Sequence, residues 1–127
     1  MAADATYPQR VIDYFDQPRN AGHFEPADDV ISATAGRIEQ GAVFRLSAQV
    51  ADDALKAVRF EAYGCPHCIA AASWLTQRLT GCPVDELGRL SWREVAQALS
   101  VPPEKHGRLL LLEDSVRRLA EAARVRS

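Results

Sequence analysis

Residues 62–73, AYGCPHCIAAAS, mark the point at which a predicted strand turns into a predicted helix. Over residues 55–62 hydrophobic side chains alternate with charged ones, the pattern of a half-buried strand. After Cys68 apolar residues recur at the helical period, and the segment is rich in alanine, the best helix former. Gly64 supplies a flexible corner, and Pro66 suits the first position of a helix, where its missing N–H would have no partner. The sequence therefore predicts a strand, a corner and a helix.

Cys65 and Cys68 form a C-x-x-C motif on the first turn of this helix. Helix N-termini carry partial positive charge and free N–H groups, which favour a thiolate over a thiol. In a thiol–disulfide oxidoreductase, a first thiolate of low pKa attacks a disulfide and the second cysteine resolves it. As metal ligands, two thiolates supply half of the four that zinc or an iron–sulfur cluster requires. Both chemistries stay open at this point, beside a purely structural role for the pair.

The composition indicates one globular domain over residues 1–127, long enough to bury a core. The formal net charge of -2 gives no electrostatic argument for nucleic acid or an anionic membrane. No apolar run approaches the ~20 residues that span a bilayer, and the first residues show no secretory signal. The three cysteines do not form the framework of a secreted disulfide domain. We therefore expect a cytoplasmic protein without nucleic-acid or membrane partners.

The remaining pattern predicts a small antiparallel sheet followed by helices. The predicted elements are a helix over 7–16, strands over 31–39, 41–50 and 55–63, and helices over 66–81, 83–88, 91–99 and 104–125. Ser91 and Glu94 have the spacing of a capping box for the third of these helices. The predicted fold is α+β, a three-stranded antiparallel sheet covered on one side by helices. A thioredoxin-like fold is excluded, because it needs strands after the C-x-x-C helix.

Three separated motifs give the chain a family resemblance. They are Tyr14-Phe15 with Pro18-Arg19-Asn20-x-Gly22, Gly64-Cys65 with Ile69-Ala70-x-x-Ser73, and Pro102-Pro103-x-Lys105. In this order the motifs resemble the IscU/NifU-type iron–sulfur cluster assembly scaffolds, over most of the chain. The resemblance implies a fold like the N-terminal domain of NifU and a role as a scaffold or carrier, not an enzyme. It also implies a cysteine desulfurase and a DnaK-type chaperone as partners.

The residues that the family uses to hold a cluster are largely replaced. The resemblance implies three cysteines, helped by an Asp and a His. The first cysteine and the Asp belong to a Cys-Gly-Asp segment, which here reads Gln40-Gly41-Ala42. The second cysteine matches Cys65, while the third and the His before it fall on Gly107-Arg108. One chain therefore keeps one of these positions.

The candidate metal ligands are Cys65 and Cys68, with His67 and His106 as possible auxiliary residues. A [2Fe–2S] cluster takes four protein ligands with deprotonated thiols, so the set for an iron–sulfur cluster or zinc is incomplete in one chain. A homodimer that meets across both cysteines would supply four thiolates. Cys82 lies at the far end of the same helix, and we interpret it as structural.

The segment Pro102-Pro103-Glu104-Lys105 resembles the family's chaperone-recognition motif. Glu104 stands where the motif has an apolar residue, and we expect it to weaken binding in a hydrophobic groove. Three hypotheses for function remain: a divergent cluster assembly scaffold or carrier, a thiol–disulfide redox protein that uses Cys65 and Cys68, and a binding module of the same fold without cluster chemistry.

Overall fold

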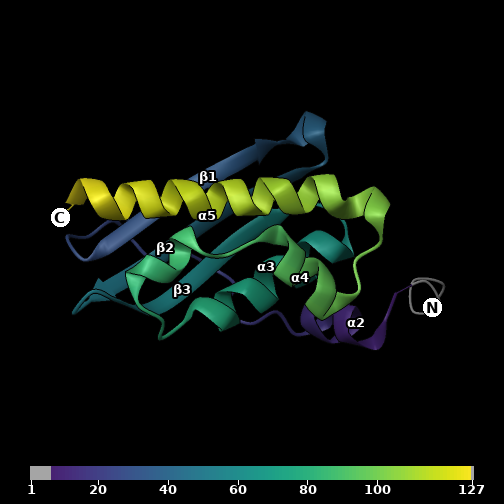
Figure 1. The fold of residues 1–127 in the computed structure, drawn as a ribbon, viewed down its shortest axis with the longest axis horizontal. Helices are drawn as coiled ribbons and strands as arrows, with labels where there is room; N and C mark the ends of the chain where they lie inside the picture. Colours follow the sequence, from purple (N-terminus) through teal and green to yellow (C-terminus); the bar gives the residue numbers. More distant parts are fainter. Residues whose placement is uncertain (1–6, 127) are drawn as a thin grey trace.

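The computed structural model describes residues 7–126 (Figure 1). The first six residues, on which the expectation of no secretory signal rests, lie outside this range. The elements in chain order are α2 (Gln9–Asp16), β1 (Val30–Arg37), η1 (Ile38–Gln40), β2 (Ala42–Ala51), β3 (Ala54–Tyr63), α3 (Pro66–Leu79), η2 (Val84–Gly88), α4 (Trp92–Leu99), η3 (Pro103–Lys105) and α5 (His106–Arg126).

The sheet has three antiparallel strands in the order β1-β2-β3. In this register Ala35 pairs with Phe44, and Leu46 pairs with Phe60. Phe44, Leu46 and Phe60 are buried on the face that the helices cover, which confirms the alternation expected of the third strand. The strand predicted over 31–39 is too long. It ends at Arg37 because residues 38–40 form a 3-10 turn that Gly41 closes with a φ of 84°.

The helices lie on one face of the sheet (Figure 1). Helix α5 crosses β1 and β2, α3 packs along β3, and α2 packs on α3. The core between the layers consists of aliphatic side chains such as Leu75 and Leu79 of α3 and Leu109, Leu112 and Leu119 of α5. The α+β fold class is therefore confirmed.

Two details of the helices differ from the prediction. The helical spacing of Val11, Tyr14 and Phe15 predicts one amphipathic stripe on α2, yet Phe15 is 37% exposed, while Val11 is buried and Tyr14 packs against the core. The capping box of α4 is incomplete. Ser91 Oγ accepts from the backbone N–H of Arg93 at 3.2 Å, whereas the Glu94 carboxylate turns away to bind Arg78.

Candidate functional site

The corner between β3 and α3 is built as the sequence predicts. Cys65 is the N-cap residue of α3, and Pro66 takes the first helical position. Gly64 has a φ of 152°, and a Cβ there would lie 2.8 Å from the Cys68 Sγ and 3.2 Å from the Gly41 carbonyl oxygen. No side chain fits in this space without displacing its neighbours. The close approach of Gly64 to Cys68 therefore depends on glycine.

The two sulfurs of the motif lie in different environments. Both cysteines are free thiols, and their Sγ atoms are 3.7 Å apart. Cys65 is half-buried at the surface, whereas Cys68 is only 1% exposed and packs in the core beneath Gly64. A reagent or partner therefore reaches the Cys65 sulfur first, with the Cys68 sulfur behind it.

A cation from the first turn of α5 faces the accessible sulfur. Arg108 Nη1 donates to Cys65 Sγ at 3.4 Å. The same guanidinium lies over Gly41, where a Cβ would come within 2.9 Å of Arg108 Nη2. The start of β2, the corner and the start of α5 therefore meet at one point. These are the three segments that the family resemblance assigns to the cluster ligands.

An open hollow adjoins this meeting point. It has a volume of about 660 Å³ and is lined by Gln40, Glu104, Lys105, Gly107, Arg108 and Leu111. The hollow brings Lys105 and Arg108 to one opening, with Glu104 as the only carboxylate of its lining. Small anionic groups are therefore favoured beside Cys65.

The environment separates the pKa values of the two thiols. Donation from the Cys68 S–H lowers the pKa of Cys65 from 9.0 to about 4, against the opposing effect of burial. The backbone N–H groups of Cys68 and His67 and the charge of Lys105 lower it further. The pKa of Cys68 is raised, because its S–H is held by the Cys65 sulfur and because it is buried. Cys65 is thus a thiolate at neutral pH, and Cys68 is a thiol.

The His67 ring lies close enough to Cys65 for the charge of that sulfur to act on it. His67 is 5% exposed, and neither ring nitrogen has a hydrogen-bond partner among the described residues. Its ring packs on Tyr7 with centroids 4.8 Å apart, beside a hollow of about 470 Å³ that also includes Pro102 and Lys105. Burial lowers the pKa of His67, which favours the neutral ring.

His106 contacts Val101 and Trp92. Its Nε2 lies 2.9 Å from the Val101 carbonyl oxygen, and its ring lies 4.8 Å from that of Trp92. Its role as an auxiliary residue of the candidate metal site stays a prediction. Within residues 7–126, no three His, Cys, Asp or Glu side chains are grouped to hold a metal ion.

The residues present do not fit an iron–sulfur cluster or a tetrahedral zinc ion. Cys65 is the accessible thiolate, Cys68 is buried, and the positive charge of Arg108 stands where a third cysteine would be. The homodimer that would supply four thiolates stays a prediction. In this conformation the Cys68 sulfur is buried beneath Gly64, so such a site would require Cys68 to move.

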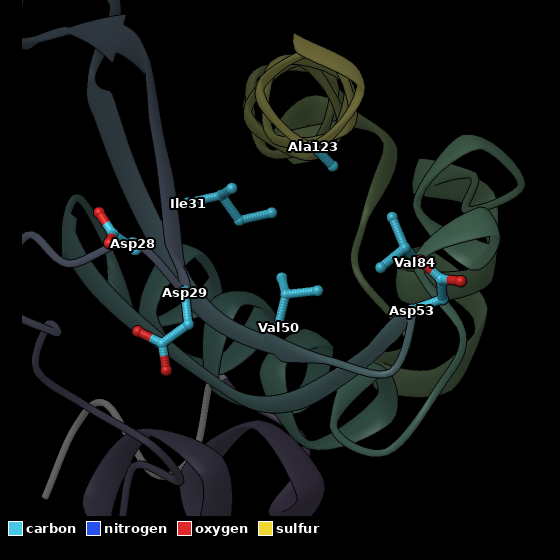
Figure 2. Close-up of a pocket in the computed structure, with 7 residues that line it drawn as sticks. All are labelled: Asp28, Asp29, Ile31, Val50, Asp53, Val84 and Ala123. Atoms are coloured by element: carbon cyan, nitrogen blue, oxygen red, sulfur yellow. The ribbon is translucent and has the colours of Figure 1, made fainter. Parts of the chain in front are cut away.

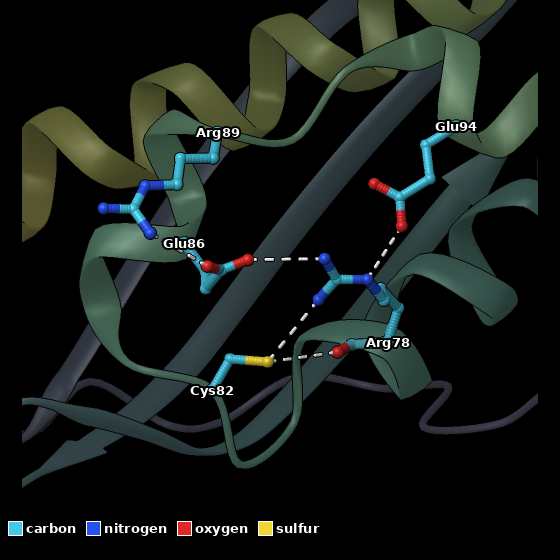
Figure 3. Close-up of polar contacts among 5 residues, drawn as sticks. All are labelled: Arg78, Cys82, Glu86, Arg89 and Glu94. Atoms are coloured by element: carbon cyan, nitrogen blue, oxygen red, sulfur yellow. Dashed lines mark hydrogen bonds and ion pairs between the residues drawn. The ribbon is translucent and has the colours of Figure 1, made fainter.

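Cys82 belongs to a separate polar cluster at the other end of α3 (Figure 3). Arg78 donates to Glu94 at 2.8 Å, to Glu86 at 3.3 Å and to the Cys82 Sγ at 3.5 Å. Arg89 also contacts Glu86. These contacts join α3, η2 and α4, which agrees with a structural role for Cys82. The contact between Arg78 and Glu94 is not predictable from the local sequence, in which Glu94 has the spacing of a capping-box residue.

Another hollow lies beside the C-terminal part of α5, next to Ala123 (Figure 2). It has a volume of about 320 Å³ and is lined by Asp28, Asp29, Ile31, Val50, Asp53, Val84 and Ala123. Figure 2 shows the aliphatic side chains pointing inward and the carboxylates turned away from the centre. Ala123 and Arg108 lie on the same helix, about 22 Å apart at the rise of an α-helix. This hollow therefore has no part in the chemistry at Cys65.

Comparison with known proteins decides the family. Residues 6–123 match the profile of the family described as NifU-like N terminal domain. The chain belongs to this family. It is 33% identical over 113 residues to the iron–sulfur cluster assembly scaffold protein IscU of Escherichia coli K12, covering 87% of this chain and 88% of that protein. It is 34% identical over 112 residues to the iron–sulfur cluster assembly protein IscU of Plasmodium falciparum, covering 87% of this chain and 69% of that protein.

The solved structures agree on the fold. A nitrogen-fixing NifU-like protein (N-terminal) from Brucella abortus superimposes with a TM-score of 0.67 at 19% identity, covering 98% of this chain and 96% of that one. The family assignment made from three short motifs is thus confirmed. Across the part of the chain that the structure describes, no helix is long and apolar enough to cross a membrane.

Proposed function

We propose that this protein is a divergent, non-enzymatic accessory of iron–sulfur cluster assembly that carries sulfur on Cys65. One observation carries the proposal: the accessible Cys65 sulfur lies 3.4 Å from the Arg108 guanidinium and 3.7 Å from a buried thiol, in a family of cluster assembly proteins. The surroundings favour an anionic sulfur and do not provide a ligand set for a metal cluster. Sulfur, not an assembled cluster, is therefore the proposed cargo.

The chemistry that suits this site is transfer of a sulfane sulfur from a donor persulfide. The Cys65 thiolate attacks the terminal sulfur of the donor R–S–SH. A bond forms between the two sulfurs, the donor S–S bond breaks, and its electron pair leaves with the donor thiolate. The product is Cys65–S–SH, so the step needs no separate oxidant or reductant. Arg108 and the N–H groups at the start of α3 stabilise the negative charge on sulfur throughout.

The partners follow from the family resemblance. A cysteine desulfurase is the proposed sulfur donor. A DnaK-type chaperone is the proposed partner of Pro102, Pro103 and Lys105, which lie at η3 beside the hollow next to Cys65. Pro103 and Glu104 are exposed there, so a peptide-binding partner would meet a carboxylate in the middle of the motif. The cytoplasmic location stays a prediction.

Sulfur transfer from a cysteine desulfurase with free cysteine tests the proposal. We expect the intact protein to become one sulfur atom heavier, at Cys65. Cys65→Ser should abolish the gain. Cys82→Ser, which changes a cysteine outside the site, should leave it unchanged. No gain of sulfur, or a gain that persists in Cys65→Ser, would reject the sulfur-carrier function.

The second candidate function is thiol–disulfide exchange. The 3.7 Å separation of Cys65 and Cys68 and the opposite shifts of their pKa values favour it. Its signature is that the reduced Cys65 and Cys68 thiols reduce a model disulfide without any sulfur donor, and in doing so become an internal Cys65–Cys68 disulfide. Failure of the reduced protein to reduce a glutathione-blocked peptide, with sulfur transfer intact, would separate the two candidates.

A further inference from the structure

We propose that Cys68 releases the sulfur carried by Cys65 as hydrosulfide, so that the C-x-x-C pair itself supplies the two electrons for the release. The inference rests on the proposed function, since a sulfane sulfur must first be present on Cys65. It adds a second step, the reduction of that sulfur, to the protein's role. The product would be a hydrosulfide ion, which an iron-binding step could use directly.

The geometry places a second thiol behind the loaded sulfur. The Cys68 Sγ is 3.7 Å from the Cys65 Sγ, in van der Waals contact and without an intervening group. The helical backbone joins the two residues, because the Cys68 N–H donates to the Cys65 carbonyl at 2.9 Å. Gly64 also lies close to Cys68, because a Cβ at Gly64 would come within 2.8 Å of the Cys68 Cβ and Sγ. Cys68 is thus held next to the one sulfur that it would attack.

Burial protects Cys68 from the competing reactions. At 1% exposure it is out of reach of a donor persulfide, of glutathione and of oxidants, while it stays in contact with Cys65. A buried thiol of raised pKa is unreactive toward reagents in solution. The positions of the two sulfurs therefore determine their roles. Cys65 reacts with the donor persulfide, and Cys68 reacts only with Cys65.

The release step balances without an external reductant. Cys68 sulfur attacks the inner sulfur of the Cys65 persulfide, Cys65–S–S⁻. A Cys65–Cys68 disulfide forms, and the bond between the Cys65 sulfur and the terminal sulfur breaks, with its electron pair on the terminal sulfur. The proton of the Cys68 thiol moves to that sulfur, which leaves as HS⁻. Two thiol sulfurs are oxidised to a disulfide, and the sulfane sulfur is reduced to sulfide.

The hydrosulfide ion would leave toward a hollow that carries positive charge. Attack comes from the buried side, so the terminal sulfur leaves toward the surface, where Arg108 contacts Cys65. The adjoining hollow of about 660 Å³ carries Lys105 and Arg108 on its lining. These cations stabilise charge as it develops on the leaving sulfur. The cycle closes when an external thiol reduces the Cys65–Cys68 disulfide.

A single-turnover reaction with glutathione persulfide under anaerobic conditions tests the release. All chains carry Cys82→Ser, so that Cys65 and Cys68 are the only thiols of the protein. The reference chain should form the internal disulfide and release one hydrosulfide per disulfide. Cys68→Ser, and Cys68→Ala as a second variant, should release none and should retain Cys65 as a persulfide, one sulfur atom heavier. Circular dichroism verifies that each variant is folded.

Each other outcome contradicts the release by Cys68, the carrier function of Cys65, or both. If the reference chain keeps its persulfide as Cys68→Ser does, the release is wrong and the carrier function stands. If no chain gains sulfur on Cys65, both proposals fail. If Cys68→Ser carries a glutathione adduct in place of a persulfide, hydrosulfide comes from the donor itself, and the release by Cys68 is wrong.

Discussion

Arg108 donates to the Cys65 sulfur at 3.4 Å, from the position where the family resemblance places a third cysteine. A cation has thus replaced a metal ligand, and it contacts the one cysteine that the chain shares with the family's ligand set. Positive charge opposes the binding of iron ions but stabilises thiolate and persulfide. This replacement is consistent with a change of cargo from a cluster to sulfur.

Replacing Arg108 by Gln should slow sulfur transfer to Cys65. Loss of one charge-assisted contact at this partly exposed site costs about 1 kcal/mol, roughly a fivefold lower rate. Arg108→Lys keeps the charge without the planar donor group, and its rate of sulfur transfer should lie between those of the native chain and of Arg108→Gln. The initial rate of sulfur gain by mass spectrometry is the measurement. Equal rates in all three chains would show that Arg108 has no effect on the sulfur.

Restoring cysteines should create a cluster site where the native chain has none. Gln40 precedes Gly41, whose backbone lies against Arg108, so Gln40→Cys and Arg108→Cys bring two thiols toward Cys65. After anaerobic reconstitution with ferrous iron and sulfide, we expect visible absorption and bound iron in this double variant and neither in the native chain. A stable cluster in the native monomer would refute the mismatch between its residues and a metal centre.

Removing the Cys68 thiol should raise the pKa of Cys65. The Cys68 S–H is the largest of the influences that lower this pKa to about 4. Alkylation of the native chain by iodoacetamide should therefore be independent of pH between about 6 and 8. In Cys68→Ala the thiolate fraction, and with it the rate, should fall as the pH is lowered. Cys68→Ser retains a donor and should follow the native profile more closely.

Gly64→Ala should destabilise the corner and displace Cys68. The new Cβ would come within 2.8 Å of the Cys68 Cβ and Sγ, in a backbone conformation with a φ of 152°. Crowding of this kind costs about 1–3 kcal/mol of unfolding free energy. Gly88→Ala is the matched control, because a Cβ there meets nothing within 4 Å, and it should change stability by less than about 0.5 kcal/mol. Urea denaturation measures both, and equal stabilities would contradict the packing described for Gly64.

The strands, the corner and the long helices followed from local sequence signals. Alternation predicts β3, Pro66 marks the start of α3, and the order of the three motifs indicates the family. The errors lie where tertiary contacts override a local pattern. Glu94 has the spacing of a capping box, but its carboxylate is used by Arg78 from another helix. The strand predicted over 31–39 ends at Arg37, because residues 38–40 form a 3-10 turn that Gly41 closes.

The candidate site was predictable only in part. The C-x-x-C motif and its place at a helix N-terminus pointed to Cys65, and the resemblance pointed to Arg108 as a replaced cysteine. The depth of each thiol was not predictable, because only two residues separate the half-buried Cys65 from Cys68, which is 1% exposed. His67 stands between the two cysteines in sequence and His106 two residues before Arg108, but the sequence does not predict that their rings pack on Tyr7 and Trp92.

The central claim is that Cys65 alone presents an accessible thiolate. Limiting alkylation of the folded native chain at a pH of about 6, where an unperturbed thiol is almost fully protonated, tests it most directly. Tandem mass spectrometry then locates the label on each of the three cysteines. The account predicts that Cys65 is labelled well before Cys68 and Cys82. Labelling of Cys82 or Cys68 first, or of no cysteine, would contradict it.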